Sequence, residues 1–115
     1  MLVIGYKQCN SCNGVEKELK EKGIDYNYRE IDKASPSAQE IKEWHSVSGL
    51  DIKKFFNTSG KSYREMNLKD KLEDMSIEEK YKLLGKDPML VKRPIIIEGN
   101  DIYVGPDAKK YVAGL

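Results

Sequence analysis

Segments with the composition of β-strands occur only near the two ends of this 115-residue chain. Residues 2–6 and 24–31 are rich in β-branched and aromatic side chains, and two further runs flank Gly99-Asn100. Residues 35–88 instead show helical spacing of their apolar side chains. A sheet can form only if the two ends come together. This predicts an α/β domain of order β-α-β, helical insert, β-β-α.

The strands at each end are joined in different ways. A helix that stops at Gly23 separates the first two strands, and strands joined through a helical crossover run parallel. The dipeptide Gly99-Asn100 is a strong hairpin signal, so the last two strands should be antiparallel neighbours. A short final helix is expected with Asp107 near its start. We expect one domain, with a core of about residues 1–34 and 89–115 and an insert of about residues 35–88.

The insert carries signals for two of its helices. Ser35 or Ser37 can cap a helix whose apolar stripe consists of Ile41, Trp44 and Val47. Further along, residues 76–79 have the sequence of a capping box, and Gly85 is the expected C-cap of that helix.

Both cysteines of the chain, Cys9 and Cys12, lie between the first strand and the first helix. A helix start offers unpaired N–H groups and a partial positive charge, and both favour a thiolate. The pKa of a cysteine, ordinarily about 8.5, can fall to roughly 3.5–7.5 in such motifs. Cys9 is therefore the candidate nucleophile, and Cys12, nearly one turn further along, is the candidate resolving cysteine.

Two other interpretations of this pair stay open. If the pair were half of a zinc site, the chain would have to supply further ligands. It has no second cysteine pair, and its single histidine, His45, is expected at the surface. Two inert core cysteines would suit apolar neighbours, whereas Gln8, Asn10 and Ser11 are polar. The pattern favours a redox pair without a metal, with Asn10 and Ser11 placed to contact substrate.

Composition limits the partners of the chain. Its net charge is +1, from 20 basic and 19 acidic residues, which argues against a nucleic-acid footprint or a polybasic membrane anchor. The sequence has no long apolar run and no secretory signal pattern at its start, so we expect a cytoplasmic protein. We also expect a monomer. In that reducing compartment a paired cysteine motif is more often catalytic, redox-sensing or metal-binding than a structural disulfide.

Several stretches resemble one protein family. These are the strand–CxxC–helix start, "LDIKKFFNTSGKSYREMNLKDKL", "LLGKDPMLVKRPIII" and "DIYVG". Together they resemble the ArsC/Spx family, an arsenate reductase-like branch of the thioredoxin-like superfamily, and look most like its small Spx/MgsR-like members. The resemblance covers essentially the whole chain. It implies a thioredoxin-like (glutaredoxin-like) α/β fold with the helical insert of the ArsC type.

The resemblance also implies roles for particular residues. Cys9 matches the family's nucleophile, and Arg93 matches an arginine that binds an oxyanion and favours the thiolate. Pro94 falls where thioredoxin-like folds carry a cis-proline beside the active cysteine, and it would shape the substrate groove. The loop that contains Asn57 and Ser59 corresponds to one that faces the nucleophile, so both are expected to bind substrate.

Three functions are compatible with these residues. The first is a thiol–disulfide oxidoreductase that binds no cofactor and draws on external glutathione, glutaredoxin or thioredoxin. The second is a redox-sensing regulator that binds the RNA polymerase α subunit, as Spx does. The third is arsenate reduction, which in this family uses three arginines. Here Asn57 and Gly105 stand where two of the three are expected, so the first function is favoured.

Overall fold

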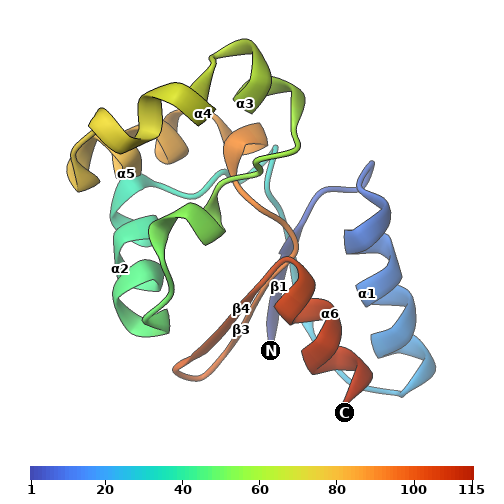
Figure 1. Cartoon of the computed structure of the whole chain (residues 1–115). Coiled ribbons are helices and arrows are strands. Elements are labelled where there is room, and N and C mark those ends of the chain that lie inside the picture. Colours follow the sequence, from blue (N-terminus) through green and yellow to red (C-terminus); the bar gives the residue numbers. More distant parts are fainter. The chain divides into compact units, whose positions relative to one another are not determined.

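A computed structural model describes all residues 1–115 (Figure 1). The chain divides into two compact units, residues 1–34 with 93–115 and residues 35–92. No helix has both the length and the apolar composition needed to cross a membrane. The first unit contains β1 (Leu2–Gly5), α1 (Asn10–Glu21), β2 (Asn27–Glu30), β3 (Ile95–Glu98), β4 (Asp101–Val104) and α6 (Pro106–Ala113). The second contains α2 (Ala38–Ser48), η1 (Ile52–Phe55), α3 (Lys61–Glu65), α4 (Leu68–Lys71), η2 (Leu72–Asp74), α5 (Ile77–Lys86) and η3 (Pro88–Leu90).

The first unit is a mixed sheet of strand order β2-β1-β3-β4. Strands β1 and β2 are parallel, as their helical crossover predicts, and Val3 is paired with Tyr28. Strand β3 runs antiparallel to both β1 and β4. The predicted hairpin at Gly99-Asn100 is confirmed, because Glu98 and Asp101 are partners on either side of it. This is the thioredoxin-like arrangement expected from the sequence.

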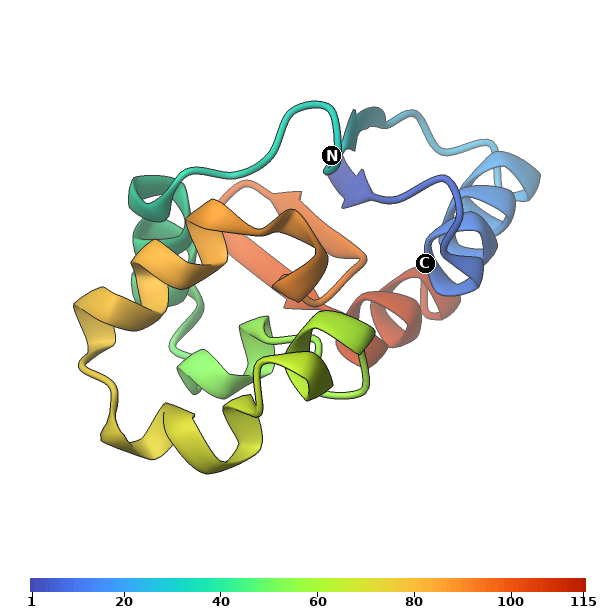
Figure 2. The ribbon, with the colours of Figure 1, turned by 90° about the horizontal axis from the view of Figure 1, so that it is seen from above.

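One face of this sheet is covered by α1 and α6, which lie side by side in both views (Figures 1 and 2). Val3 and Ile96 from the strands meet Val15 and Leu19 of α1 and Val112 of α6 in a single buried cluster. Burial of such aliphatic side chains contributes about 1.5–3 kcal/mol each to stability. The packing holds the start of α1, and therefore the cysteine pair, in a defined position on the sheet.

Lys22, just after α1, ties the two covering helices together. Its Nζ donates to the backbone carbonyls of Val112 (2.7 Å) and Ala113 (3.0 Å), which belong to the last turn of α6. Carbonyls at a helix end have no partner within the helix, so a cation there satisfies them and complements the dipole.

Replacement of Lys22 by methionine removes these bonds while keeping an apolar stem of similar length. We expect Lys22→Met to lower the free energy of unfolding by about 1–2 kcal/mol. Lys20→Met is the matched control, since Lys20 is exposed on the same helix and donates no such bond, and it should change stability by less than about 0.5 kcal/mol. Urea unfolding monitored by circular dichroism measures both values. Equal stability of the two variants would contradict the role of the α6 carbonyls.

The second unit confirms part of the expected helix pattern. Ser37 caps α2, accepting from the backbone N–H of Glu40 in a capping box, and Ile41 and Trp44 are buried. Val47, expected on the same stripe, is 53% exposed. In a helix with 3.6 residues per turn, each step of three residues leaves the side chain about 60° away from the face where it started. Val47 is two such steps after Ile41, so its side chain no longer points to the buried face that contains Ile41.

The helix α5 begins at the predicted capping box of Ser76 but does not end at Gly85. Gly85 lies inside the helix, and its C-cap is Asp87. A Cβ atom at Gly85 would stand 2.7 Å from the backbone nitrogen of Ala38, the first residue of α2. The expected C-cap role is therefore wrong, and the glycine instead permits the close approach of α2 and α5.

His45, expected at the surface, is half-buried within the same unit. Its Nδ1 lies 2.6 Å from the hydroxyl oxygen of Tyr81 on α5. Its ring also meets Phe55 edge to face, at 6.1 Å between centroids. The histidine joins α2 to its neighbours by these contacts, which is a packing role.

Candidate active site around Cys9 and Cys12

The cysteine pair lies at the start of α1, as expected from the sequence. Cys9 is the N-cap residue with an extended backbone (φ −101°, ψ 118°), and its N–H donates to the carbonyl of Tyr6 at 2.9 Å. Cys9 is partly exposed, whereas Cys12 in the first turn is fully buried. Both thiols are reduced. The outer cysteine is thus reachable by a substrate, and the inner one is reachable only from within the protein.

The surroundings of Cys9 favour its thiolate. Partial burial by itself would raise its pKa. The backbone N–H and the side chain of Cys12, the charge of Arg93 and the backbone N–H of Ser11 act in the opposite direction and outweigh burial. The pKa of Cys9 therefore lies below its ordinary value. The Cys9 side chain does not form the N-cap hydrogen bond that a capping residue can make to the first turn of its helix.

Cys12 is affected in the opposite sense. Burial raises the pKa of its thiol to about 12, and the neighbouring Cys9 adds to the shift. Two cysteines three residues apart thus have pKa values displaced in opposite directions. At neutral pH the exposed sulfur is the better nucleophile, and the buried one stays protonated.

Arg93 and Pro94 approach the cysteines from the loop before β3. The peptide bond between them is cis, as the thioredoxin-like resemblance implied. The Arg93 guanidinium carbon lies 5.3 Å from the ring centroid of Tyr6, the residue that follows β1. Its positive charge favours the thiolate of both cysteines, but for Cys12 the effect of burial is larger and the pKa stays raised. Pro94 is buried, and its carbonyl accepts from the N–H of Gly105 at 2.8 Å.

The other expected substrate contacts lie in different places. Asn10 and Ser11 are the first residues of α1, the former exposed and the latter partly buried. Asn57 and Ser59 belong to the second unit. There the Asn57 N–H donates to the Leu90 carbonyl at 2.7 Å. Contact of these four polar residues with a substrate stays a prediction.

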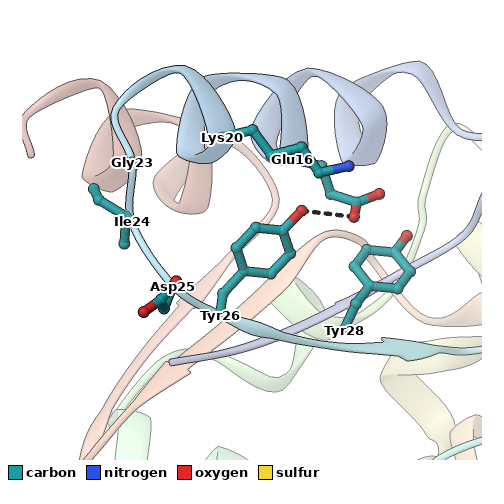
Figure 3. A pocket seen from close by; sticks show the side chains of 7 residues that line it. All are labelled: Glu16, Lys20, Gly23, Ile24, Asp25, Tyr26 and Tyr28. Carbon is teal, nitrogen blue, oxygen red and sulfur yellow. Dashed lines mark hydrogen bonds between the residues drawn. The ribbon is translucent and has the colours of Figure 1, made fainter.

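The structure adds a polar cluster that the sequence analysis did not identify. Glu16 of α1 is 8% exposed, and its carboxylate accepts from the Tyr26 hydroxyl at 2.8 Å and pairs with the Lys7 Nζ at 3.2 Å. Figure 3 shows Glu16 above Tyr26 and Tyr28, in a pocket of about 480 Å³ that Lys20 also lines. The ion pair and the hydrogen bond compensate a carboxylate buried under the helix.

Tyr28 brings this cluster to the cysteines. Its ring lies under the Lys7 Nζ, 4.0 Å from the centroid, and its hydroxyl is buried. A Cβ atom at Gly5 would stand 2.5 Å from that hydroxyl and 3.1 Å from the Cys12 Sγ. The absence of a side chain at Gly5 therefore lets the hydroxyl and the sulfur lie near each other above β1.

The sequence held a signal for this cluster. Glu16 is four residues after Cys12, so both fall on the helix face that carries the buried Leu19. Tyr26, just before β2, and Tyr28 within it are two residues apart, so their side chains point to the same face of the extended chain. No group of three or more histidine, cysteine, aspartate or glutamate side chains is placed to hold a metal ion.

Comparison with known proteins identifies relatives along nearly the whole chain. The sequence model of the ArsC family matches residues 4–113. The protein YusI of Bacillus subtilis is 47% identical over 100 residues, 87% of this chain and 85% of YusI. The regulatory protein MgsR of the same organism is 28% identical over 87% of this chain and 78% of its own length. The global transcriptional regulator Spx of Listeria innocua is 30% identical over 84% of this chain and 72% of its own length.

Solved structures show the same fold. An ArsC family related protein from Bacteroides fragilis superposes with a TM-score of 0.88 at 39% identity, covering 96% of this chain and 95% of the other. A possible arsenate reductase from Streptococcus mutans superposes with a TM-score of 0.84 at 42% identity, covering 91% and 89%. The sequence-based fold assignment is therefore confirmed.

Proposed function

The chain belongs to the ArsC family, and we propose that it is a thiol–disulfide oxidoreductase with Cys9 as nucleophile and Cys12 as resolving cysteine. The observation that carries the proposal is the placement of the two thiols at the start of α1, with Cys9 partly exposed as the N-cap and Cys12 fully buried in the first turn. The pKa of Cys9 is lowered and that of Cys12 is raised, in agreement with this placement. An attacking thiol must be ionised and accessible, whereas a resolving thiol must wait until a mixed disulfide has formed beside it.

The reaction has two exchange steps. The Cys9 thiolate attacks a substrate disulfide, forms a mixed disulfide and releases one substrate thiolate. The Cys12 sulfur then attacks the Cys9 sulfur, closing a Cys9–Cys12 disulfide and releasing the second substrate thiolate, while the Cys12 proton passes to that thiolate or to solvent. The substrate gains two electrons, and the cysteine pair loses two.

An external thiol would complete the cycle. No bound cofactor is needed in this scheme, because a dithiol protein such as thioredoxin, or glutathione with glutaredoxin, can reduce the Cys9–Cys12 disulfide by the same exchange chemistry. Such donors belong to a reducing compartment, which agrees with the cytoplasmic location expected from the sequence. Pro94 and the first turn of α1 would form the floor of the substrate groove.

The alkylation of Cys9 at different pH values tests this proposal. Arg93→Ala removes a positive charge that lowers the pKa of Cys9, so the rate of reaction with iodoacetamide should rise at a higher pH than in the wild type. Arg93→Lys keeps a charge at this position and should shift the curve less. A wild-type Cys9 that titrates at or above its ordinary pKa, with no reversible two-electron couple in a redox titration, would contradict the proposal.

A second candidate is a redox-controlled regulator. MgsR and Spx carry regulator names and match more than four-fifths of this chain. Formation of a Cys9–Cys12 disulfide would change the start of α1 and could alter a binding surface for the RNA polymerase α subunit. Binding to the purified α subunit, measured with the reduced and the oxidised chain, tests this candidate. Oxidation-dependent binding without turnover of disulfides would favour it over the reductase.

Arsenate reduction has weaker support. The possible arsenate reductase of Streptococcus mutans is 42% identical to this chain, but Asn57 and Gly105 replace two expected arginines. Gly105 has φ 60° and ψ −122°, a conformation that an arginine adopts only with strain. Arsenate-dependent consumption of a thiol donor would establish the activity, and its absence would leave disulfides as the substrate class.

A further inference from the structure

The Tyr28 hydroxyl is the one polar atom of the cluster under α1 without a hydrogen-bond partner, although it is fully buried. Most buried polar groups in proteins are hydrogen-bonded, and one left unpaired lowers stability. The neighbouring acceptor, Glu16, is already engaged by Tyr26 and Lys7. The hydroxyl therefore has a donor to offer, and it shares the space above Gly5 with the Cys12 sulfur: a Cβ atom at Gly5 would lie 2.5 Å from the hydroxyl and 3.1 Å from the sulfur.

The charges that act on Tyr28 indicate the same neighbour. Burial raises the pKa of Tyr28, and among the surrounding charges that of Cys12 acts most strongly. Tyr28 thus stays protonated throughout the pH range in which the cysteines react. The titratable and charged groups that face it are Cys9, Cys12, Glu16, Glu30 and, over the ring, Lys7.

We propose that the Tyr28 hydroxyl donates a hydrogen bond to the Cys12 sulfur as that sulfur becomes a thiolate during resolution of the mixed disulfide. The inference rests on the proposed function and assigns to Tyr28 a part of the second exchange step alone. The buried Cys12 is a poor nucleophile as a thiol, because the charge of Arg93 that acts on it does not offset the effect of burial on its pKa. A neutral donor held on β2 stabilises the developing negative charge without adding a charge to the core.

No electrons pass through Tyr28 in this step. The Cys12–hydrogen bond breaks, and the proton leaves to the released thiolate or to solvent. The new sulfur–sulfur bond forms between Cys12 and Cys9 while the bond from Cys9 to the substrate sulfur breaks. The tyrosine keeps its own proton and shares it with the Cys12 sulfur during the attack.

Tyr28→Phe isolates the hydroxyl, because it keeps the ring under Lys7 and the packing on β1. The probe is the aromatic disulfide dithiobis(nitrobenzoic acid), whose released thiolate is coloured. In the wild type, attack by Cys9 releases one equivalent and attack by Cys12 then releases a second. We expect Tyr28→Phe to leave the first release unchanged and to slow the second about tenfold or more, as loss of a hydrogen bond to a charged group implies.

Tyr26→Phe is the matched control on the same segment. It removes the hydrogen bond to Glu16 but leaves the Tyr28 hydroxyl in place, so the second release should keep its wild-type rate. Tyr28→Phe should also be as stable as the wild type or more stable, because the hydroxyl it removes has no partner in the resting protein. An unfolding experiment on both variants separates a slower reaction from a damaged fold.

The outcomes distinguish the two proposals. If Tyr28→Phe releases the second equivalent at the wild-type rate, the role of Tyr28 is wrong and the reductase proposal stands. If the wild type releases only one equivalent, the resolving role of Cys12 and the role of Tyr28 both fall.

Discussion

Cys9→Ser should abolish the reduction of a model disulfide, with a loss of at least about 1,000-fold, or about 4 kcal/mol of transition-state stabilisation. Serine is nearly isosteric, but its hydroxyl stays protonated where the Cys9 thiol ionises. The helix start, the Cys12 N–H and the Arg93 charge that stabilise a thiolate then have no anion to act upon. Turnover of a small-molecule disulfide with a thioredoxin-coupled reductant measures the effect.

Cys12→Ser is the matched variant, and it should behave differently. Attack by Cys9 should still occur, so the first equivalent of thiol is released and the substrate stays attached to Cys9. Intact-protein mass spectrometry should detect this adduct in Cys12→Ser and should find none in Cys9→Ser. Full turnover in Cys12→Ser would show that an external thiol resolves the adduct and that Cys12 has no obligatory role. If Cys9→Ser keeps the activity of the wild type, Cys9 is not the nucleophile.

The parts of the fold that the sequence predicted correctly depend on local signals. The capping box at Ser76 needs only a serine and a glutamate three residues apart. Ser37, one of the two caps expected for α2, is the residue that caps it. The hairpin at Gly99-Asn100 needs only its turn residues. The parallel pairing of β1 and β2 follows from the helix α1 that connects them, because parallel strands need such a crossover. The cap and the turn act within a few residues, and the parallel pairing follows from the order of elements in one β-α-β segment, so all of them can be predicted without knowledge of the tertiary packing.

The errors arise where tertiary packing decides. A glycine near the end of a helical pattern commonly marks its C-cap, but Gly85 is set by its contact with Ala38, 47 residues earlier in the chain. Val47 fits the apolar stripe of α2 by spacing and is exposed because the stripe rotates away from it. His45 has no sequence neighbour that predicts its bond to Tyr81, which comes from another helix.

The candidate site divides in the same way. Cys9, Cys12 and the cis bond at Pro94 were predicted because a motif or a family resemblance places them. The position of the Tyr28 hydroxyl depends on the β1–β2 register, on the missing side chain of Gly5 and on the first turn of α1 together. No single stretch of sequence contains all three, so the surroundings of Cys12 could not be predicted from the sequence.

Gly85→Ala should destabilise the chain by about 1–3 kcal/mol, even though alanine is the better helix former. The added methyl group would stand 2.7 Å from the backbone nitrogen and 3.1 Å from the Cα of Ala38. Backbone atoms at the start of α2 cannot rotate away as a side chain can, so α2 and α5 must separate. Chemical unfolding measured by circular dichroism gives the change.

Gly14→Ala provides the opposite result from the same substitution. Gly14 also lies inside a helix, α1, but no atom lies within 4 Å of the Cβ position. Alanine there loses less backbone entropy on folding than glycine, so stability should rise by about 0.5–1 kcal/mol. If both variants change the free energy of unfolding in the same direction, the change at Gly85 is due to helix propensity or to a global effect. It is then not due to the close approach of α2 and α5. Opposite signs would show that the contact with Ala38 overrides the intrinsic preference of the helix.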